Sequence, residues 1–443
     1  MGNFITIGEY NKLYKFMWFF ISFKLIYEYL YGSDFPIEIK LIKHYSFPKS
    51  VLIQEFLNYI GVFIFSIFLF IYEKIQNKPE TSEEESHNSH NTNDSHSTSR
   101  KSIKSPLIYQ NYENYTVSYK PVIIVIILII VCDQLRNTFF IFNLKGLDFK
   151  MFEILFVCII TFLMFKITIY RHKKIAIGFL VIFCLAMKTL SVIYRIIDDH
   201  KKRIFKIYTW IIPIGISGFI LISLLRSYNF CKVKWLFDLR FISVSKLLLF
   251  YGSLGFIFCF IISTVVNYVP CVDKDTFSNI NFICNVTEVD SSTNSTIYYY
   301  ERYSVYIKSL WKKERHSYIN VLFLVLIVIK TFLYFLIKLF GLLIIKNLRP
   351  EYLICSNAIY YFIIESIDTI ECLILGKFRY YKLYDILEDL FSILGTVFYL
   401  ELIEFDFCGI DFNLKKNIKK RCLSESKLGS SLEESSEDSN VSD

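Results

Sequence analysis

Residues 319–345 read INVLFLVLIVIKTFLYFLIKLFGLLII, a run of 27 residues in which Lys330 and Lys338 are the charged positions. A helix rises 1.5 Å per residue, so about 20 apolar residues cross a hydrocarbon core about 30 Å thick. Apolar runs of this length exceed what the elements of a soluble domain usually need. The stretch therefore predicts a transmembrane helix, and the rest of the chain can be compared with it.

Nine further apolar segments follow the same pattern. They cover residues 16–31, 52–72, 121–142, 151–170, 175–196, 204–225, 247–269, 353–375 and 383–402. The first is the weakest, because Lys24 and Glu28 interrupt it, and it either spans the membrane or lies at its interface. The chain is 54% hydrophobic and 20% charged, with a mean hydropathy of +0.41. The sequence predicts an all-α, polytopic integral membrane helix bundle with about ten transmembrane helices.

Polar stretches divide the 443-residue chain into six regions. Two predicted helices lie in residues 1–72, five in 121–269 and three in 319–404, separated by loops 73–120 and 270–318 and followed by the tail 405–443. The first loop is rich in Ser, Asn, His and Glu and cannot bury a core, so we predict that it is disordered. Ten segments are compatible with two inverted halves of five, but the sequence displays no internal repeat.

The second loop carries features of an oxidising compartment. Asn285 and Asn294 each begin an N-glycosylation sequon, and Cys271 and Cys284 are candidates for a disulfide. These features favour a lumenal or extracellular loop. Alternation through ten spans then places both termini in the cytosol, in a protein of the secretory pathway or the plasma membrane.

Other features leave this orientation open. Asn93 and Asn114 begin sequons in the first loop, and the two loops cannot both be lumenal if all ten segments span. The distribution of Lys and Arg favours the same orientation only weakly. In the tail, which is basic and then acidic and Ser-rich, Ser431 and Ser435 each precede an acidic residue by three positions. They are candidate phosphorylation sites on the cytosolic side.

Ionisable side chains inside a bilayer cost free energy, so each is a candidate functional residue. The ninth segment carries Glu365, Asp368 and Glu371, and their spacing of three places them on one face of a helix. If the eighth and ninth segments form a hairpin, Lys338 comes level with Glu365, and Lys330 with Asp368 and Glu371. These five residues predict either ion pairs that fix helix register or a water-filled path for a proton, a cation or a charged solute.

Further charges lie in other segments. Asp385, Glu388 and Asp389 add acids near the start of the tenth segment. Asp133 and Arg136 in the third segment are three residues apart and can pair on their own helix. The sixth segment alone combines Pro and Gly, at residues 210–218, which predicts a break that either binds an ion or forms a packing kink.

Several classes of function find no support in the sequence. Nucleophile-elbow, zinc-protease, phosphate-loop and dinucleotide-binding motifs do not occur. We therefore expect a protein that is not an enzyme and that uses no cofactor and no metal. The net charge of +8 comes from Lys and Arg near helix ends, which indicates headgroup contacts rather than nucleic acid. The expected partners are the lipid bilayer and a small solute or cation.

Three short stretches carry a resemblance. Residues 401–409 read ELIEFDFCG, residues 413–421 read NLKKNIKKR and residues 348–354 read LRPEYLI. Together they resemble a group of uncharacterised multispanning membrane proteins from AT-rich, protist-like genomes, over the last quarter of the chain. The ten spans, cytosolic termini and cysteine-bearing loop between the seventh and eighth spans are also similar to the drug/metabolite transporter superfamily.

Two functional hypotheses follow. The first is a solute or ion transporter, either carrier or channel-like, whose path uses the acidic face of the ninth helix, with Glu365 and Asp368 taking a proton or cation and Lys330 and Lys338 balancing them. The second is a non-transporting membrane scaffold or receptor that acts through the second loop and the phosphorylatable tail.

Overall fold

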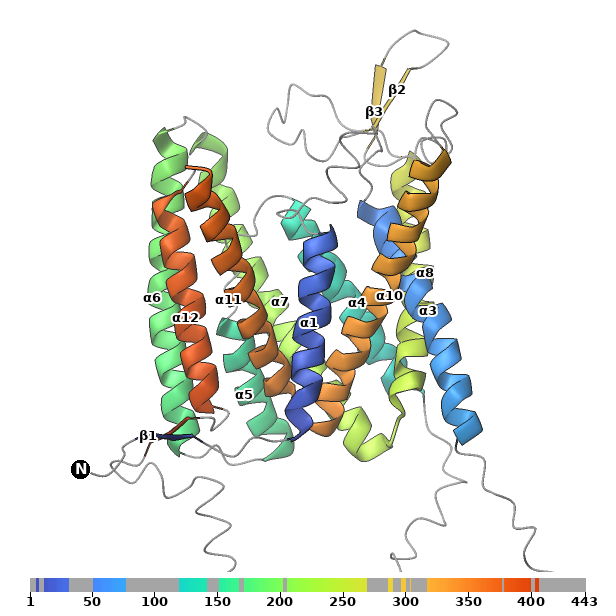
Figure 1. The fold of residues 1–443 in the computed structure, drawn as a ribbon, viewed down its shortest axis with the longest axis horizontal. Coiled ribbons are helices and arrows are strands. Elements are labelled where there is room, and N and C mark those ends of the chain that lie inside the picture. The colour runs from blue at the N-terminus through green and yellow to red at the C-terminus, as the bar shows by residue number, and fades with distance from the viewer. Residues whose placement is uncertain are drawn as a thin grey trace, which may run out of the picture.

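The computed structural model describes residues 5–7, 12–31, 51–76, 119–141, 151–166, 171–201, 205–268, 286–289, 296–299, 303, 317–376, 378–399 and 403–405. Within them the chain forms ten long helices, and a 3₁₀ turn (Lys12–Tyr14) precedes the first (Figure 1). The helices are α1 (Lys15–Tyr31), α3 (Val51–Gln76), α4 (Lys120–Ile141), α5 (Met151–Phe165), α6 (Arg171–Lys201), α7 (Phe205–Arg240), α8 (Val244–Tyr268), α10 (Ser317–Asn347), α11 (Pro350–Ile374) and α12 (Tyr380–Tyr399).

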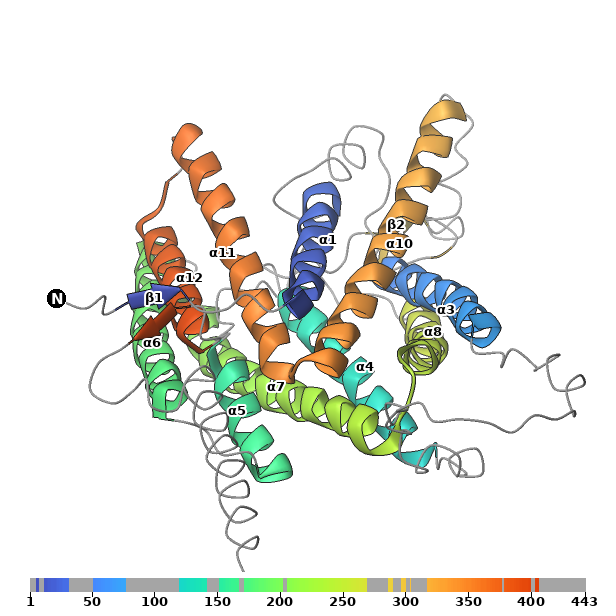
Figure 2. The same cartoon turned by 60° about the horizontal axis from the view of Figure 1, so that its bottom comes forward.

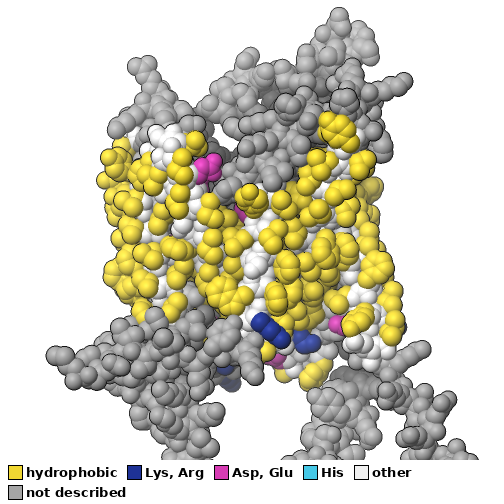
Figure 3. All heavy atoms as spheres, in the orientation of Figure 1, with side chains coloured by type: hydrophobic (Ala, Val, Ile, Leu, Met, Phe, Trp, Pro, Cys, Tyr) yellow, Lys and Arg dark blue, Asp and Glu magenta, His cyan; other side chains and the backbone are white. Residues whose placement is uncertain are grey.

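Each predicted segment coincides with one of these helices, which confirms the all-helical bundle. Five of them, α3, α6, α8, α10 and α11, are long and apolar enough to cross a membrane. Helix α5 is apolar but shorter. Figure 3 shows that the outer surface of the helical body is largely apolar, with a few charged side chains near its lower end. Phe68, Leu163 and Ile182 are each about two thirds exposed, as expected for side chains that face lipid.

Short strands lie at the two ends of the bundle. Strand β1 (Ile5–Ile7) pairs antiparallel with β4 (Ile403–Phe405), with Ile5 opposite Phe405. This pairing holds the segment before α1 beside the segment after α12 (Figure 1). Strands β2 (Val286–Val289) and β3 (Thr296–Tyr299) form a hairpin within the predicted second loop, at the opposite end of the bundle (Figure 1).

Some boundaries differ from those predicted. Helix α3 continues to Gln76 and α4 begins at Lys120, so only residues 77–118 of the predicted first loop lie outside the described residues. Helix α7 continues to Arg240, well past residue 225. Helix α7 runs through residues 210–218 without interruption, so the helix does not end there; the packing kink stays a prediction. A proline removes one backbone hydrogen bond, and a long helix with intact turns on both sides tolerates that loss.

The helices form two layers between two flanking pairs. Figure 2 shows α11, α1 and α10 side by side in a first layer, and α5, α7 and α4 in a second layer. The neighbours within each layer pack against one another. Helices α6 and α12 pack along much of their length at one side, and α3 and α8 do the same at the other. The two layers therefore face each other across the middle of the molecule.

This packing reveals an internal repeat. Each helix of the first five has a counterpart in the second five: α1 with α7, α3 with α8, α4 with α10, α5 with α11 and α6 with α12. If both helices of a contacting pair are replaced by their counterparts, the result is again a contacting pair. This holds for the most extensive helix pairs. The pair α1–α10 becomes α7–α4, α1–α11 becomes α7–α5, α3–α10 becomes α8–α4, and α11–α12 becomes α5–α6, while α3–α8, α6–α12 and α5–α11 map onto themselves. We call this correspondence the five-helix exchange.

The repeat is inverted. Successive long helices run in alternating directions (Figure 1), so two counterparts separated by five positions point in opposite directions. The starts of counterparts are about 190 to 210 residues apart. The helix contacts thus follow the pattern of two inverted halves of five helices.

Glycines allow the closest approaches between the helices of the two flanking pairs. A Cβ added at Gly252 of α8 would lie 2.6 Å from the backbone nitrogen of Phe63 in α3. A Cβ added at Gly255 would overlap the ring of Tyr59, and one at Gly395 of α12 would lie 2.9 Å from the Leu180 side chain in α6. The flanking pairs are therefore tight, although the chain contains only 15 glycines.

Candidate functional site

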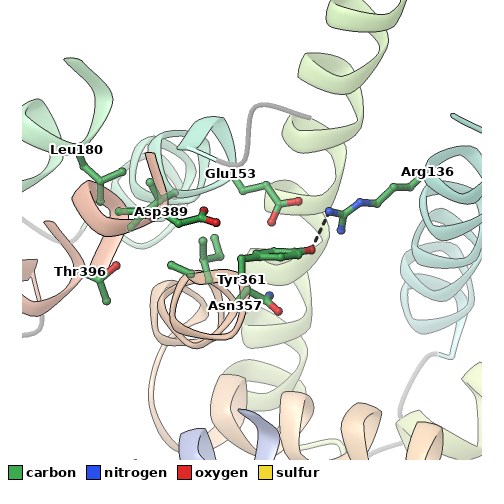
Figure 4. Close-up of a pocket in the computed structure, with 11 residues that line it drawn as sticks. Arg136, Glu153, Leu180, Asn357, Tyr361, Asp389 and Thr396 are labelled. Carbon is green, nitrogen blue, oxygen red and sulfur yellow. Dashed lines mark hydrogen bonds between the residues drawn. The ribbon is translucent and has the colours of Figure 1, made fainter. Parts of the chain in front are cut away.

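A small cavity with polar and apolar walls lies where the two layers and α12 meet. Its polar lining comes from four helices: Arg136 on α4, Glu153 on α5, Asn357 and Tyr361 on α11, and Asp389, Ser392 and Thr396 on α12 (Figure 4). About 20 Å³ of it is open to the centres of water molecules, which is room for about one or two waters. We call it the central cavity.

Two polar contacts around the cavity connect corresponding helices. Arg226 on α7 donates a hydrogen bond to Glu153 on α5 and forms an ion pair with it. Lys24 on α1 donates to Asn357 on α11, with Nζ 2.6 Å from Oδ1. The five-helix exchange converts α7–α5 into α1–α11, so the first helix of each half places a cation on an acceptor in the fourth helix of the other half.

Tyr361 connects these contacts across the layers. Its hydroxyl accepts a hydrogen bond from Arg136, with 3.1 Å between Nη2 and the oxygen. The ammonium of Lys24 lies 4.8 Å from the centre of the Tyr361 ring and 4.0 Å from that of Tyr360. Tyr360 in turn donates to Glu28 over 3.2 Å. Two cations thus meet one aromatic side chain, which ties α11 to α1 and to α4.

The acids of α12 belong to a second, buried network. Lys188 of α6 lies 3.5 Å from Asp385 and 3.3 Å from Glu388. The Ser191 hydroxyl donates to Asp385 over 2.7 Å, and Arg195 forms an ion pair with the same carboxylate. These contacts join two cations and two acids of the described residues. Asp389, only 2% exposed, follows Glu388 directly and faces the central cavity (Figure 4).

The predicted pairing between the eighth and ninth segments is wrong. Lys338 of α10 donates to Asp133 of α4 over 2.8 Å, and Lys330 donates to Gln54 of α3 over 2.9 Å. The reason is that α1 lies between α10 and α11 (Figure 2). These two helices therefore diverge instead of forming a hairpin with matched charges. The expected pair on a single helix is also replaced, because Asp133 and Arg136 each reach another helix.

The acidic face of α11 continues the line of the central cavity. Asn357, Tyr361, Glu365 and Asp368 follow one another at spacings of four, four and three residues, so they lie on one side of the helix. Asp368 forms an ion pair with Lys382 of α12. Glu365 and Glu371 are half-buried and form no ion pair with any other residue in the described part of the chain. A polar line therefore runs from the cavity to the end of α11.

Sequence reasoning did not select five of these residues: Lys24, Glu153, Arg226, Asn357 and Tyr361. Lys24 interrupts a weak apolar segment in the sequence, which gives no sign of its contacts. Arg226 follows directly after the predicted end of the sixth segment, and the continuation of α7 to Arg240 brings this charge inside the bundle. The signal that could have found them is the charge of Lys24 and Glu153 inside apolar stretches.

Other predicted sites lie outside the described residues: Asn285, Asn294, Cys271, Cys284, Ser431 and Ser435. The described helices contain no group of three or more His, Cys, Asp or Glu side chains placed to hold a metal ion. No family model matches the chain, and a comparison with curated proteins gives no match either.

Proposed function

We propose that this chain is a carrier that moves a small polar solute across a membrane, with ten spans and both termini on the cytosolic side. The observation that carries the proposal is the inverted repeat of five helices with polar side chains of both halves around one cavity. Carriers built from inverted repeats bind substrate near the middle of the bilayer, where the halves meet, and expose it alternately to the two sides.

The path that we propose follows α11. Its central-cavity residues, Asn357 and Tyr361, lie about three and two helical turns from Asp368, at 3.6 residues per turn. Glu365 lies between them and forms no ion pair within the described part of the chain. A half-buried carboxylate without an ion pair is best stabilised by water, by a proton or by a passing cation. We therefore keep Glu365, Asp368 and Glu371 as path residues.

Lys330 and Lys338 enter the proposal in a different role. Each now contacts a helix other than α11, and both lie on the first layer at α10. The contact between Lys338 and Asp133 joins the two layers, so it belongs to the contacts that must change when the layers move. The scaffold or receptor alternative would act through residues 270–318 and 405–443, most of which lie outside the described residues.

Accessibility to a water-soluble thiol reagent tests the proposed path. Glu365→Cys and Asp368→Cys are made singly in a chain from which the eleven native cysteines are removed. Ile367→Cys and Ile370→Cys are the matched controls, because both side chains lie at the same depth of α11 on its exposed apolar side. A path predicts rapid labelling at the two acidic positions and slow labelling at the two controls.

The opposite pattern has a clear meaning. Absence of labelling at both acidic positions in folded, membrane-inserted protein would show a dry, structural face on α11 and would refute the carrier path. Folding is checked on each variant by its elution as a single species and by its thermal unfolding temperature. The parent chain without cysteines gives the background.

A further inference from the structure

Glu351 is a buried acid at the start of α11, at the opposite end of the proposed path from Asp368. We infer that Glu351 is a proton-binding residue of this path and that the ion carried along α11 is the proton. The inference rests on the proposed carrier function and adds the identity of the ion that moves along the path. It follows from the burial of Glu351, from its lack of a counterion and from its place on the helix.

Glu351 has no cation paired with it. The residue is 2% exposed, and its Oε2 atom is buried without a hydrogen-bond partner. It forms no ion pair with any residue in the described parts of the chain. A buried carboxylate without a counterion costs free energy, and binding of a proton removes the charge. A proton also needs no additional space, unlike a metal ion or an organic cation.

The counterpart of α11 carries a paired acid at the equivalent place. Helices α5 and α11 correspond in the five-helix exchange, and each has one acid in its first turn, Glu153 and Glu351 respectively. Glu153 is also buried, with an exposure of 7%, but Arg226 of α7 forms an ion pair with it. Glu351 has no such arginine. This difference favours a fixed ion pair at Glu153 and an exchangeable proton at Glu351.

The ionisable groups around Glu351 do not pair with it in the described residues. Lys173 of α6 is 8% exposed, and its ammonium lies 4.9 Å from the centre of the Tyr399 ring. Tyr14, in the turn before α1, packs against Tyr352, the residue that follows Glu351. The other groups near Glu351 are Arg349 just before α11, Cys355 on α11, Cys158 on α5 and Cys231 on α7, while Lys346 at the end of α10 is exposed. Thiols and phenols therefore surround this carboxyl group.

Glu351 lies on the same side of α11 as the acids of the proposed path. Glu365 follows it after 14 residues, which is about four helical turns. Ile354 and Ala358, between these two acids, line the central cavity. The cavity has room for about one or two waters. In this conformation that space is too small for an organic solute, but one or two hydrogen-bonded waters can pass on a proton.

Thiol and hydroxyl groups lie between Glu351 and the cavity. Cys355, one turn further along α11, is fully buried and lies close to the hydroxyl of Thr396 on α12. Thr396 lines the central cavity. On the side of α5, the Thr161 hydroxyl lies near Glu351 and 3.5 Å from the sulfur of Cys231. Such groups both donate and accept hydrogen bonds, so they can relay a proton where an aliphatic side chain cannot.

Dicyclohexylcarbodiimide tests the proton on Glu351 directly, because this apolar reagent adds to protonated carboxyl groups in apolar surroundings. We would treat the unaltered full-length protein in lipid vesicles at acidic and at alkaline pH and locate the product by mass spectrometry of its peptides. The inference predicts labelling at Glu351 that increases as the pH falls. Glu153 is the matched control in the same sample. It should stay unlabelled, because its ion pair with Arg226 keeps it a carboxylate.

A substitution tests whether this proton moves. Glu351→Gln should slow proton uptake into proteoliposomes at least about tenfold, because an amide does not take up a proton. Uptake is driven by a potassium diffusion potential and followed with an entrapped pH-sensitive dye. The thermal unfolding temperature should not fall, since the substitution breaks no ion pair in the described residues. Asp238→Asn, at a 44% exposed side chain near the end of α7, is the control and should leave uptake unchanged.

Two outcomes would overturn the inference. They are an absence of carbodiimide labelling at Glu351 in folded protein, and normal proton uptake by Glu351→Gln. If Glu351→Gln does not fold, labelling of the unaltered protein still decides whether this residue takes a proton. Either failure, combined with rapid thiol labelling at Glu365→Cys and Asp368→Cys, would retain the carrier path and reject the proton site. Absence of thiol labelling at both positions would reject the carrier as well.

Discussion

Lys338 of α10 donates a hydrogen bond to Asp133 of α4, with Nζ 2.8 Å from Oδ2. The two helices are counterparts in the five-helix exchange, and they lie in different layers. Tyr251 of α8 donates to the same carboxylate over 3.0 Å, and the Lys338 ammonium lies 4.9 Å from the centre of the Tyr251 ring. Because this contact joins the two layers, it must change if the layers move against each other.

Removing one partner of this pair should destabilise the protein. We expect Lys338→Met or Asp133→Asn alone to lower the free energy of unfolding by roughly 1–3 kcal/mol, since each leaves a half-buried charge without its partner. The double variant should lose less than the sum of the two. Thermal unfolding of the purified protein measures all three variants. Strictly additive losses would show that the two side chains do not interact.

A glycine on α8 offers a test of the tight flanking pair. Gly252→Ala should lower the free energy of unfolding by about 1–3 kcal/mol, because the new Cβ meets the backbone of Phe63 at 2.6 Å. Gly178→Ala on α6 is the matched control. Its Cβ would meet nothing within 4 Å, so the higher helix propensity of alanine should leave stability unchanged or slightly raised. Equal stability of the two variants would contradict the close approach of α3 and α8.

The buried network between α6 and α12 should be the most sensitive. Lys188→Met leaves Asp385 and Glu388 without the cation that contacts both, and we expect a loss of about 3–5 kcal/mol. The yield of folded protein in the membrane fraction should fall accordingly. Lys246→Met, at an exposed position near the start of α8, is the control. A normal yield for Lys188→Met would mean that water or other side chains replace the lysine at little cost.

The number of helices and their positions along the chain follow from the sequence. Which helices pack against one another does not. Hydropathy identifies apolar runs because each helix in lipid must satisfy its own backbone. The same property hides the packing, since an apolar helix offers apolar side chains on every side. Helix α10 illustrates this. Nothing in residues 319–345 shows that α1, which is a weaker segment from the other end of the chain, lies between α10 and α11.

The candidate site was predictable only in part. The spacing of Glu365, Asp368 and Glu371 correctly indicates one face of α11. The partner of Asp368 is Lys382, a residue just before the tenth apolar run. In a sequence, charges at the ends of such runs indicate contacts with lipid headgroups. Asn357 and Tyr361 gave no signal, because Tyr and Asn are common throughout the chain. Their role depends on cations from α1 and α4 that only the folded arrangement brings near.

A substitution at Glu365 separates an effect on transport from an effect on folding. Glu365 forms no ion pair in the described part of the chain, so Glu365→Gln should change the free energy of unfolding by less than about 0.5 kcal/mol. If the carboxylate lies on the path, the same variant should slow proton uptake into proteoliposomes, followed with an entrapped pH-sensitive dye, at least about tenfold, because the amide neither carries charge nor takes a proton.

The control for this variant is a carboxylate of the same bundle that has a partner. Glu388→Gln breaks the contact with Lys188, so it should lower stability and yield before it affects uptake per folded molecule. Under the carrier proposal, Glu365→Gln therefore loses uptake and keeps stability, whereas Glu388→Gln loses stability and keeps uptake per folded molecule. A Glu365→Gln protein that unfolds early but transports normally when folded would place Glu365 in the structure of α11 and remove it from the path.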